Sequence, residues 1–180
     1  SADQRAGRAG REGPGEVVRV FTRDEYAKMQ PDITPEILTA DLTAAALTMA
    51  AWGSPDLPLL DAPPDLTEAE HNLEAIGALD GGTITDLGKR LATLPLDPRL
   101  GAALIECGAQ AAPTVARLAG DADPKRLARL VEDKGPAPAG EVIASAFPQW
   151  IAKKVGDEYQ LASGTRAAFN SRAEWIAAAE

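Results

Sequence analysis

The sequence predicts a mainly α-helical fold with small β elements, and three observations support this. Hydrophobic residues make up 45% of the 180 positions and aromatic residues only 4%, so the core must rest on Ala, Leu, Ile and Val. Helix start and stop signals recur along the chain, and the apolar residues between them follow helical spacing. Runs rich in β-branched residues are few and short, which limits the β content.

Composition excludes several classes of protein. The net charge is -9, so bulk electrostatic affinity for nucleic acid is not expected and any such binding must be local. A single cysteine, Cys107, and a single histidine, His71, rule out an internal disulfide framework and leave no basis for a metal site. The longest mainly apolar run, residues 42–52, is too short for a bilayer, and no signal peptide is visible. We therefore expect no membrane contact and a cytoplasmic location.

The first 33 residues differ in composition from the rest. Residues 1–15 are rich in arginine and glycine and contain almost nothing that a core could bury. Residues 16–21 have the β-branched content of a strand, and residues 22–26 suit a short helical turn or a loop. Pro31 and Pro35 bracket a break before the helical part of the chain.

A helix is predicted from Thr34 to Gly53. Thr34 is a good N-cap, Pro35 suits the first helical position, and Gly53 is placed to end the helix. Apolar residues at spacings of three and four predict one buried face, in which Trp52 belongs to the core. This face consists of Leu38, Leu42, Ala45, Met49 and Trp52.

Two further helices follow with a short β element between them. Thr67 predicts a helix start with a capping box closed by Glu70, and residues 83–85 suit a very short strand. The third helix spans about residues 86–94 and stops at Pro95. The inward face of the second helix is Ala69, Leu73, Ile76 and Leu79. The order helix, helix, β turn, helix fits a winged helix, although a generic helical unit has the same order.

The remaining chain is predicted as helices followed by a hairpin. One helix starts at Pro98 and is broken at Pro113, and another starts at the Asp123-Pro124 pair. A linker at 135–140 precedes a helix over 141–154 with a possible kink at Pro148, and residues 158–169 read as a hairpin. The end at 174–176 suits a strand or a helix equally well.

The sharpest local feature is the run Gln4-Arg5-Ala6-Gly7-Arg8-Ala9-Gly10-Arg11. Three arginines at a spacing of three, interleaved with Gly and Ala, place guanidinium groups near a backbone that a ligand can approach. A guanidinium matches phosphate oxygens as a fork of donors, and phosphoryl transfer uses such a group to neutralise charge on the γ-phosphate. The run predicts a nucleotide site, with a flexible or RNA-binding Arg/Gly tail as the alternative.

This run resembles motif VI (QRxGRxGR) of superfamily 2 helicases, in the form of the DEAH-type RNA helicases, including bacterial members. Residues 75–80, 85–88 and 91–100 also resemble that family, and the resemblance covers nearly the whole chain. It implies the end of a RecA-like domain, a winged helix, a helical ratchet bundle and the start of a β-containing C-terminal segment. The implied boundaries are 1–33, 34–98, 99–154 and 155–180.

The resemblance also implies roles for single residues. Gln4 would face the γ-phosphate of ATP bound with Mg²⁺, Arg8 and Arg11 would be arginine fingers, and Arg5 would make structural or inter-domain contacts. Single-stranded RNA is the implied partner, held by the winged helix and the ratchet. No Walker A loop or DEAH box occurs in the sequence. We therefore expect the C-terminal portion of a helicase, inactive alone, which needs the N-terminal RecA-like domains as partners.

Other candidates are weaker. Lys89, Arg90 and Arg99 could reach a phosphate backbone, although ordinary surface charge explains them as well. Cys107 reads as a buried structural thiol. Trp150 could stack on a base, but packing at the junction between helix and hairpin is the stronger interpretation. Two alternative functions are a non-enzymatic winged-helix module that binds nucleic acid and a helical scaffold that recruits another protein.

Overall fold

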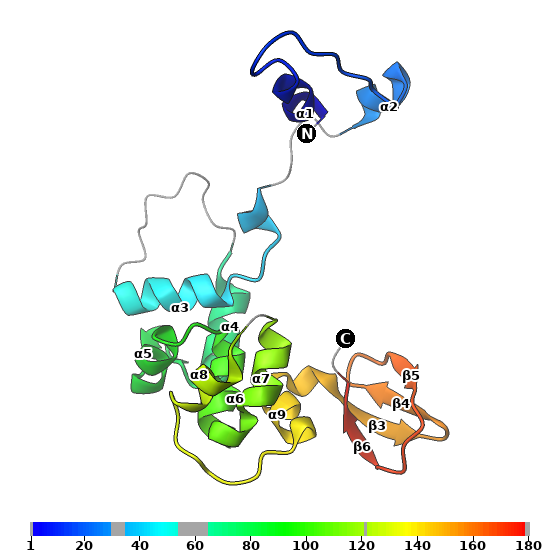
Figure 1. Cartoon of the computed structure of the whole chain (residues 1–180). Helices are drawn as coiled ribbons and strands as arrows, with labels where there is room; N and C mark the ends of the chain where they lie inside the picture. Colours follow the sequence, from blue (N-terminus) through cyan, green and yellow to red (C-terminus); the bar gives the residue numbers. More distant parts are fainter. Residues whose placement is uncertain (1, 30–34, 54–64, 121, 179–180) are drawn as a thin grey trace. The chain divides into compact units, whose positions relative to one another are not determined.

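The chain forms two units in a computed structural model that describes residues 2–29, 35–53, 65–120 and 122–178 (Figure 1). The described residues up to Ala40 belong to the first unit, and those from Asp41 onward belong to the second. Thr34, the expected N-cap, lies outside the described residues. Each unit is treated by itself below.

The first unit contains two short helices without a core. These are α1 (Ala2–Arg8) and α2 (Arg23–Lys28), and neither contains a buried residue. Thr22 and Glu25 form a capping box at the start of α2, which confirms the expected helical turn at this place. A 3₁₀ turn, η1 (Glu36–Leu38), follows later in the chain.

The strand predicted over residues 16–21 is wrong. These residues have no strand structure, and Val18 and Val20 are 85% and 93% exposed. A strand needs a neighbour to satisfy its backbone N–H and C=O groups, and no described segment pairs with this one. The β-branched content therefore gives an extended conformation but no sheet.

The second unit begins with a small domain of helices around a β-hairpin. Helices α3 (Thr43–Trp52), α4 (Thr67–Ala75) and α5 (Asp86–Ala92) surround the hairpin of β1 (Leu79–Asp80) and β2 (Thr83–Ile84). This order confirms the helix, helix, β turn, helix pattern expected from the sequence. The core of this domain consists of Ala46, Leu47, Ala69, Leu73, Ala78, Leu79 and Leu91.

Two details of this domain differ from expectation. Helix α3 starts at Thr43, where the Asp41 carboxylate accepts a hydrogen bond from the Thr43 amide. The 3₁₀ turn η1 ends earlier in the chain, at Leu38. The buried face is Thr43, Ala46 and Leu47, so the predicted stripe is rotated and Trp52 is 78% exposed. Ala, which is small enough for close helix packing, fills the core here.

The helix starts and ends carry clear chemical signals. Gly53 ends α3 in the left-handed conformation, as expected. At α4 the predicted capping box is wrong. The Asp65 carboxylate accepts a hydrogen bond from the Thr67 amide, and the Thr67 side chain does not cap the helix. At α5, the Thr85 hydroxyl accepts the Gly88 amide.

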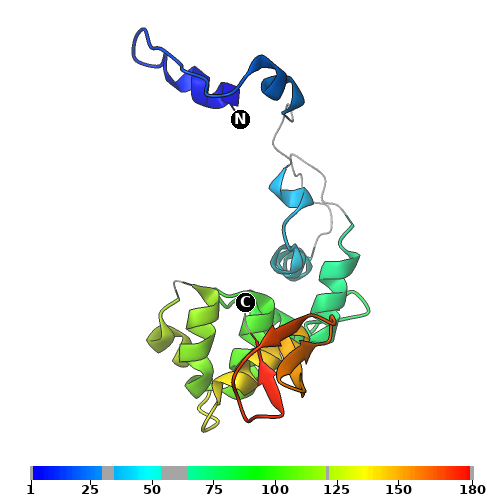
Figure 2. The same ribbon diagram turned by 90° about the vertical axis from the view of Figure 1, so that its right-hand side faces the viewer.

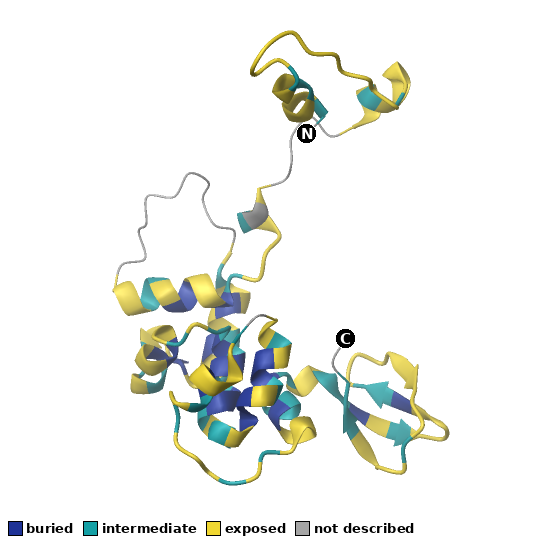
Figure 3. Cartoon of the chain, viewed as in Figure 1, coloured by how far each residue is buried: buried dark blue, intermediate teal, exposed yellow. Residues whose placement is uncertain are grey.

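A second helical cluster follows directly in the chain. Its helices are α6 (Pro98–Cys107), α7 (Ala112–Ala119), α8 (Pro124–Ala128) and α9 (Ala139–Ala146), with the 3₁₀ turn η2 (Ala109–Ala111) between α6 and α7. Asp123 caps α8, as predicted. Helix α6 ends before Pro113, with Gly108 as its C-cap, and Pro113 lies in the first turn of α7. Buried residues gather in these helices (Figure 3).

Helix α6 belongs to both cores. Leu100, Ala103 and Leu104 are buried in the core formed with α7, α8 and α9. Ala102 and Ile105, on another side of the helix, pack against the winged-helix core. The periodicity of α6 therefore places apolar side chains on two faces of one helix.

A four-stranded antiparallel sheet ends the chain. After the 3₁₀ turn η3 (Pro148–Trp150), the strands β3 (Ile151–Val155), β4 (Glu158–Leu161), β5 (Arg166–Ala168) and β6 (Trp175–Ala177) are ordered β5-β4-β3-β6. Helix α9 contacts β6, and the sheet, which lies to one side of the helices in Figure 1, is turned toward the viewer in Figure 2. The strand interpretation of the last segment is thus correct.

The helix predicted over residues 141–154 is wrong in its second half. Phe147 leaves the helical conformation before Pro148, because a residue that precedes proline disfavours α geometry. The next residues pair as β3 with two neighbouring strands, and tertiary pairing overrides any helical tendency. None of the helices within the described ranges has the length and hydropathy needed to cross a bilayer.

Candidate nucleotide and nucleic-acid sites

The arginine run lies on and just after α1. Gln4 and Arg8 share a face of this helix, Arg5 lies one residue after Gln4, and Arg11 follows in a bend. All four side chains are exposed. Arg8 and Arg11 line one shallow hollow together with Glu12, and neither forms an ion pair with another described residue. The structure therefore brings together the two arginines that the sequence proposes as fingers.

A small cluster fixes the first turn of α1. The Asp3 carboxylate accepts a hydrogen bond at 2.9 Å from the Arg19 guanidinium and another from the Tyr26 hydroxyl. Arg19 also lies 5.0 Å from the centre of the Tyr26 ring, and Phe21 stacks on that ring. The hydrogen bond to Asp3 raises the pKa of Tyr26. These contacts connect α2 and the segment before it to α1, the helix that carries the arginine run.

The arginine site suits an anionic ligand. Two exposed guanidinium groups offer donors in a planar fork that matches phosphate oxygens. The described residues contain no group of three His, Cys, Asp or Glu side chains able to hold a metal ion. The exposed guanidinium groups of Arg8 and Arg11 can stabilise phosphate charge electrostatically.

Two cations lie on the outer side of α5. Gly88 and Leu91 are buried against the domain, whereas Lys89 and Arg90 between them are exposed. Lys89 forms an exposed pair with Asp86 at 3.1 Å, which is weak in water and easily exchanged. Lys89 and Arg90 are therefore available to a phosphate backbone.

Arg99 is placed differently. Its guanidinium lies 2.6 Å from Asp41 and 3.0 Å from Asp97, with a side-chain exposure of 20%. It also lies 5.4 Å from the centre of the Phe147 ring. The hydrogen bond to Asp97, followed by that to Asp41, raises the pKa of the guanidinium although burial lowers it. The donors of Arg99 serve the protein's own carboxylates, so of the three cations proposed from the sequence Lys89 and Arg90 are the more accessible to nucleic acid.

The remaining sequence candidates have structural surroundings. Cys107 is half-buried, and burial, followed by the charges of Glu106 and Glu141, raises the pKa of its thiol. This agrees with a structural cysteine. Trp150 stacks on Phe147 with ring centres 4.2 Å apart, which supports a packing role at the junction between α9 and the sheet.

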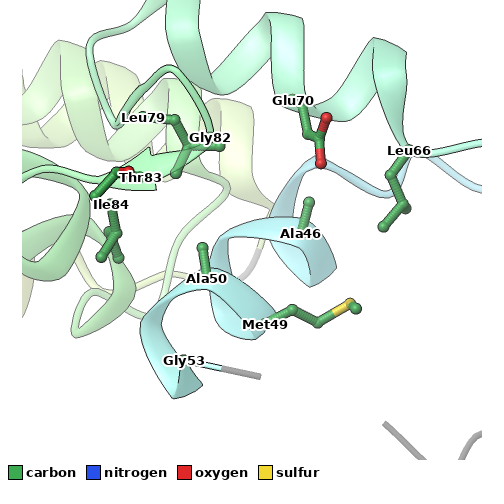
Figure 4. A pocket seen from close by; sticks show the side chains of 10 residues that line it. All are labelled: Ala46, Met49, Ala50, Gly53, Leu66, Glu70, Leu79, Gly82, Thr83 and Ile84. Carbon is green, nitrogen blue, oxygen red and sulfur yellow. The ribbon is translucent and has the colours of Figure 1, made fainter. Parts of the chain in front are cut away.

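The sequence did not predict an apolar groove on the winged-helix domain. It has a volume of about 420 Å³ and lies between α3, α4 and the β1-β2 hairpin (Figure 4). Glu70 contributes the one carboxylate of its lining, and Met49 lies at its α3 side. The groove combines side chains of three elements. The spacing of apolar residues did not reveal it, because the buried face of α3 is rotated from the predicted one.

Comparison with known proteins finds relatives of this chain. The helicase-associated domain (HA2), winged-helix, matches residues 69–96, which run from α4 through the hairpin to the end of α5 and the turn beyond. The ATP-dependent RNA helicase HrpB of Escherichia coli K12 is 31% identical over 219 aligned positions, covering 99% of this chain and 27% of that protein. The crystal structure of E. coli DExH-box NTPase HrpB matches 97% of this chain with a TM-score of 0.78 and 28% identity.

The chain is homologous to the C-terminal region of the ATP-dependent RNA helicases HrpB and prp22. The splicing factor prp22 of Schizosaccharomyces pombe, an ATP-dependent RNA helicase, is 41% identical over 111 residues, or 58% of this chain and 10% of that protein. The chain spans about a quarter of the length of HrpB, its curated relative. The helicase homology confirms the predicted resemblance and the mainly α fold with a winged helix.

Proposed function

We propose that the chain acts as the C-terminal part of an ATP-dependent DEAH-type RNA helicase, which couples ATP hydrolysis to movement on or remodelling of single-stranded RNA. The observation that carries this proposal is the match to HrpB over 99% of the chain, together with a TM-score of 0.78 to its crystal structure. Arg8 and Arg11 support the same function, because their exposed guanidinium groups suit a phosphate ligand and neither has an ion-pair partner among the described residues.

Individual roles follow from this proposal. Arg8 and Arg11 contact the γ-phosphate of ATP and neutralise the charge that develops there, Gln4 faces the same phosphate, and Arg5 makes structural contacts. Bound Mg²⁺ neutralises phosphate charge, and its ligands belong to the Walker A and DEAH segments of the N-terminal RecA-like domains. The hollow lined by Arg8 and Arg11 then closes against the partner domain that holds the nucleotide.

The RNA side of the proposal concerns the second unit. The winged helix and the helical bundle form a platform for single-stranded RNA, and Lys89 and Arg90 on α5 contact its phosphates. The proposed domain limits are 1–33, 34–98, 99–154 and 155–180, and the proposed location is the cytoplasm.

An ATPase assay tests the arginine roles. In a polypeptide that joins this chain to Walker A and DEAH segments, Arg8→Ala is expected to leave ATP binding in place and to lower hydrolysis about 10³–10⁵-fold, as for other arginine fingers. Arg23→Ala is the matched control, since it removes an exposed arginine on α2 that lies outside the arginine run. The 180-residue chain alone is expected to show no turnover above background.

Three results would redirect the proposal. Unchanged hydrolysis in Arg8→Ala removes the finger role. If the full-length protein has no Walker lysine, the non-enzymatic winged-helix module that binds nucleic acid is favoured. A stable protein complex without any RNA binding favours the helical scaffold.

A further inference from the structure

The hollow beside Arg8 and Arg11 is shaped by one short loop. All of its lining residues lie between positions 8 and 14, so a single stretch of chain forms it. This loop begins where α1 ends, at Arg8, and Arg11 lies in its bend. None of residues 8–14 is buried, so no core holds the loop in place. The relative positions of the two guanidinium groups therefore depend on what fixes the backbone at the ends of the loop and of α1.

Gly15 closes this loop on its own beginning. A Cβ at position 15 would overlap the Ala9 carbonyl oxygen and would lie 2.7 Å from the carbonyl carbon of the same residue. Ordinary contact of a Cβ begins at 3.4 Å, so the two backbone segments approach as closely as only a glycine permits. Ala9 turns directly after α1, since its amide donates to the Ala6 carbonyl at 3.2 Å. The crossing of Gly15 on Ala9 therefore sets the shape of the loop that carries Arg11.

The carboxylate of Asp3 fixes the opposite end of α1. Its Oδ1 atom accepts a hydrogen bond from Arg19 at 2.9 Å and its Oδ2 atom accepts one from the Tyr26 hydroxyl, so both carboxylate oxygens are engaged. The Arg19 guanidinium also lies 5.0 Å from the centre of the Tyr26 ring. Arg19 follows Gly15 by four residues in the chain. One segment therefore contacts α1 in its first turn and the loop just past its end.

The chemistry of Asp3 and Gly15 leaves them one route by which to influence a phosphate. A carboxylate repels phosphate and glycine has no side chain, so neither residue offers a side chain that binds a nucleotide. Asp3 lies in the helix that ends at Arg8. Gly15 contacts the residue that directly follows Arg8. Their effect on a phosphate therefore passes through the placement of Arg8 and Arg11.

We propose that Asp3 and Gly15 are positioning residues, which hold the guanidinium groups of Arg8 and Arg11 in the placement that neutralises the γ-phosphate. This role rests on the proposed helicase function, in which the two arginines are the fingers. Gly15 fixes the loop that carries Arg11, and Asp3 fixes the helix that ends at Arg8. A misplacement of about 1 Å lowers a catalysed rate by as much as about 10²-fold, so small shifts of this loop have a large effect.

ATP hydrolysis by the polypeptide that joins this chain to Walker A and DEAH segments tests the role of Gly15. Gly15→Ala is expected to lower kcat about 10–10²-fold, since the new Cβ displaces the loop from Ala9 by about 1 Å or more. Gly140→Ala is the matched control, because no atom lies within 4 Å of its added Cβ and it lies in α9, outside the first unit. It is expected to leave kcat unchanged.

Asp3→Asn tests the other end of α1 in the same assay. The substitution keeps the size of the side chain and removes the charge that holds the Arg19 guanidinium, so kcat is expected to fall about 3–10-fold. Asp24→Asn is the matched control, because Asp24 is exposed on α2 and its substitution changes the net charge by the same amount. This variant is expected to keep the kcat of the unmodified protein.

A transition-state analogue separates positioning from a loss of structure. Both Gly15→Ala and Asp3→Asn are expected to bind ADP with unchanged affinity. They are expected to bind ADP with aluminium fluoride more weakly, by about the factor that each loses in kcat, because the fingers act on charge that develops in the transition state. Equal losses of affinity for ADP and for the analogue indicate a purely structural role and overturn the proposal.

Failure of this proposal is distinguishable from failure of the helicase function. Equal kcat in a variant and its control overturns the positioning role of that residue, and the helicase function still stands if Arg8→Ala lowers hydrolysis. If Gly15→Ala does not fold, the comparison of Asp3→Asn with Asp24→Asn decides the proposal alone. Unchanged hydrolysis in Arg8→Ala removes the finger role and the positioning role together.

Discussion

The Arg99 guanidinium lies 2.6 Å from the Asp41 carboxylate, a residue 58 positions earlier in the chain. This pair connects the segment before α3 with the start of α6. Asp97 binds the same guanidinium, and Phe147 at the end of α9 lies against it. One side chain thereby connects the winged-helix domain with the helical bundle.

Replacing this guanidinium should destabilise the second unit. Arg99→Gln is expected to lower the free energy of unfolding by about 2 kcal/mol, the usual contribution of hydrogen bonds to charged groups. A double-mutant cycle with Asp41→Asn should show a coupling energy of about 1 kcal/mol, measured by urea unfolding. Arg90→Gln, at an exposed position, is the control and should change stability little. Additive effects of the Arg99 and Asp41 substitutions would contradict a direct interaction.

Acid should remove part of this stabilisation. Burial raises the pKa of Asp41, but the hydrogen bonds from Thr43 and Arg99 outweigh it and hold the pKa below its ordinary value. A lowered carboxyl pKa in the folded state stabilises the fold above the unfolded pKa of about 3.9, and this contribution is lost as pH falls through the folded pKa. The stability difference between the unmodified chain and Asp41→Asn should be constant from pH 5 to 7.

Below pH 4 that difference should shrink. Because the Asp41 side chain is 49% exposed, we expect its pH-dependent part to stay below about 1 kcal/mol. Chemical denaturation at several pH values measures it. A difference that grows on acidification would show that the Asp41 pKa is raised rather than lowered.

Gly88 should not tolerate a side chain. A Cβ at this position would lie 2.2 Å from the Ala78 carbonyl oxygen and 2.8 Å from Ile84, because α5 packs directly on the hairpin. Gly88→Ala is expected to cost about 1–3 kcal/mol by overpacking, seen as a lower melting temperature. Gly140→Ala is the control: no atom lies within 4 Å of its added Cβ, and alanine in α9 should be neutral or slightly stabilising.

Cys107 should react slowly as a thiol. Burial is the main cause of its raised pKa, so little thiolate is present near pH 8 and access is restricted. Alkylation by iodoacetamide is expected to be several-fold slower in the folded chain than in urea, and to accelerate as pH rises above 9. Equal rates in both states would show that the thiol is neither shielded nor perturbed.

Local chemistry made parts of this structure predictable. The helical turn after Thr22, the Asp123 cap of α8 and the left-handed Gly53 each depend on neighbours in sequence, so they could be predicted from it. The proximity of the arginines to one another was predictable for the same reason, because they are close together in the chain.

Long-range contacts account for what could not be predicted. The face of α3 is set by α4 and α5, so the regular spacing that ends at Trp52 pointed to the wrong side of the helix. Arg99 was proposed as a contact for nucleic acid, since nothing in the sequence shows that Asp41 lies beside it. The pairing of Lys153 with Gln160 and with Trp175 across the C-terminal sheet depends on strand register, which sequence spacing does not determine.

Helix α6 has a mechanical consequence, because its two sides are built into two different cores. Because α6 packs in both cores, it cannot move with one domain without moving the other. The winged-helix domain and the bundle should therefore unfold in one transition and move as one rigid body, with no hinge at the point where their sequences meet.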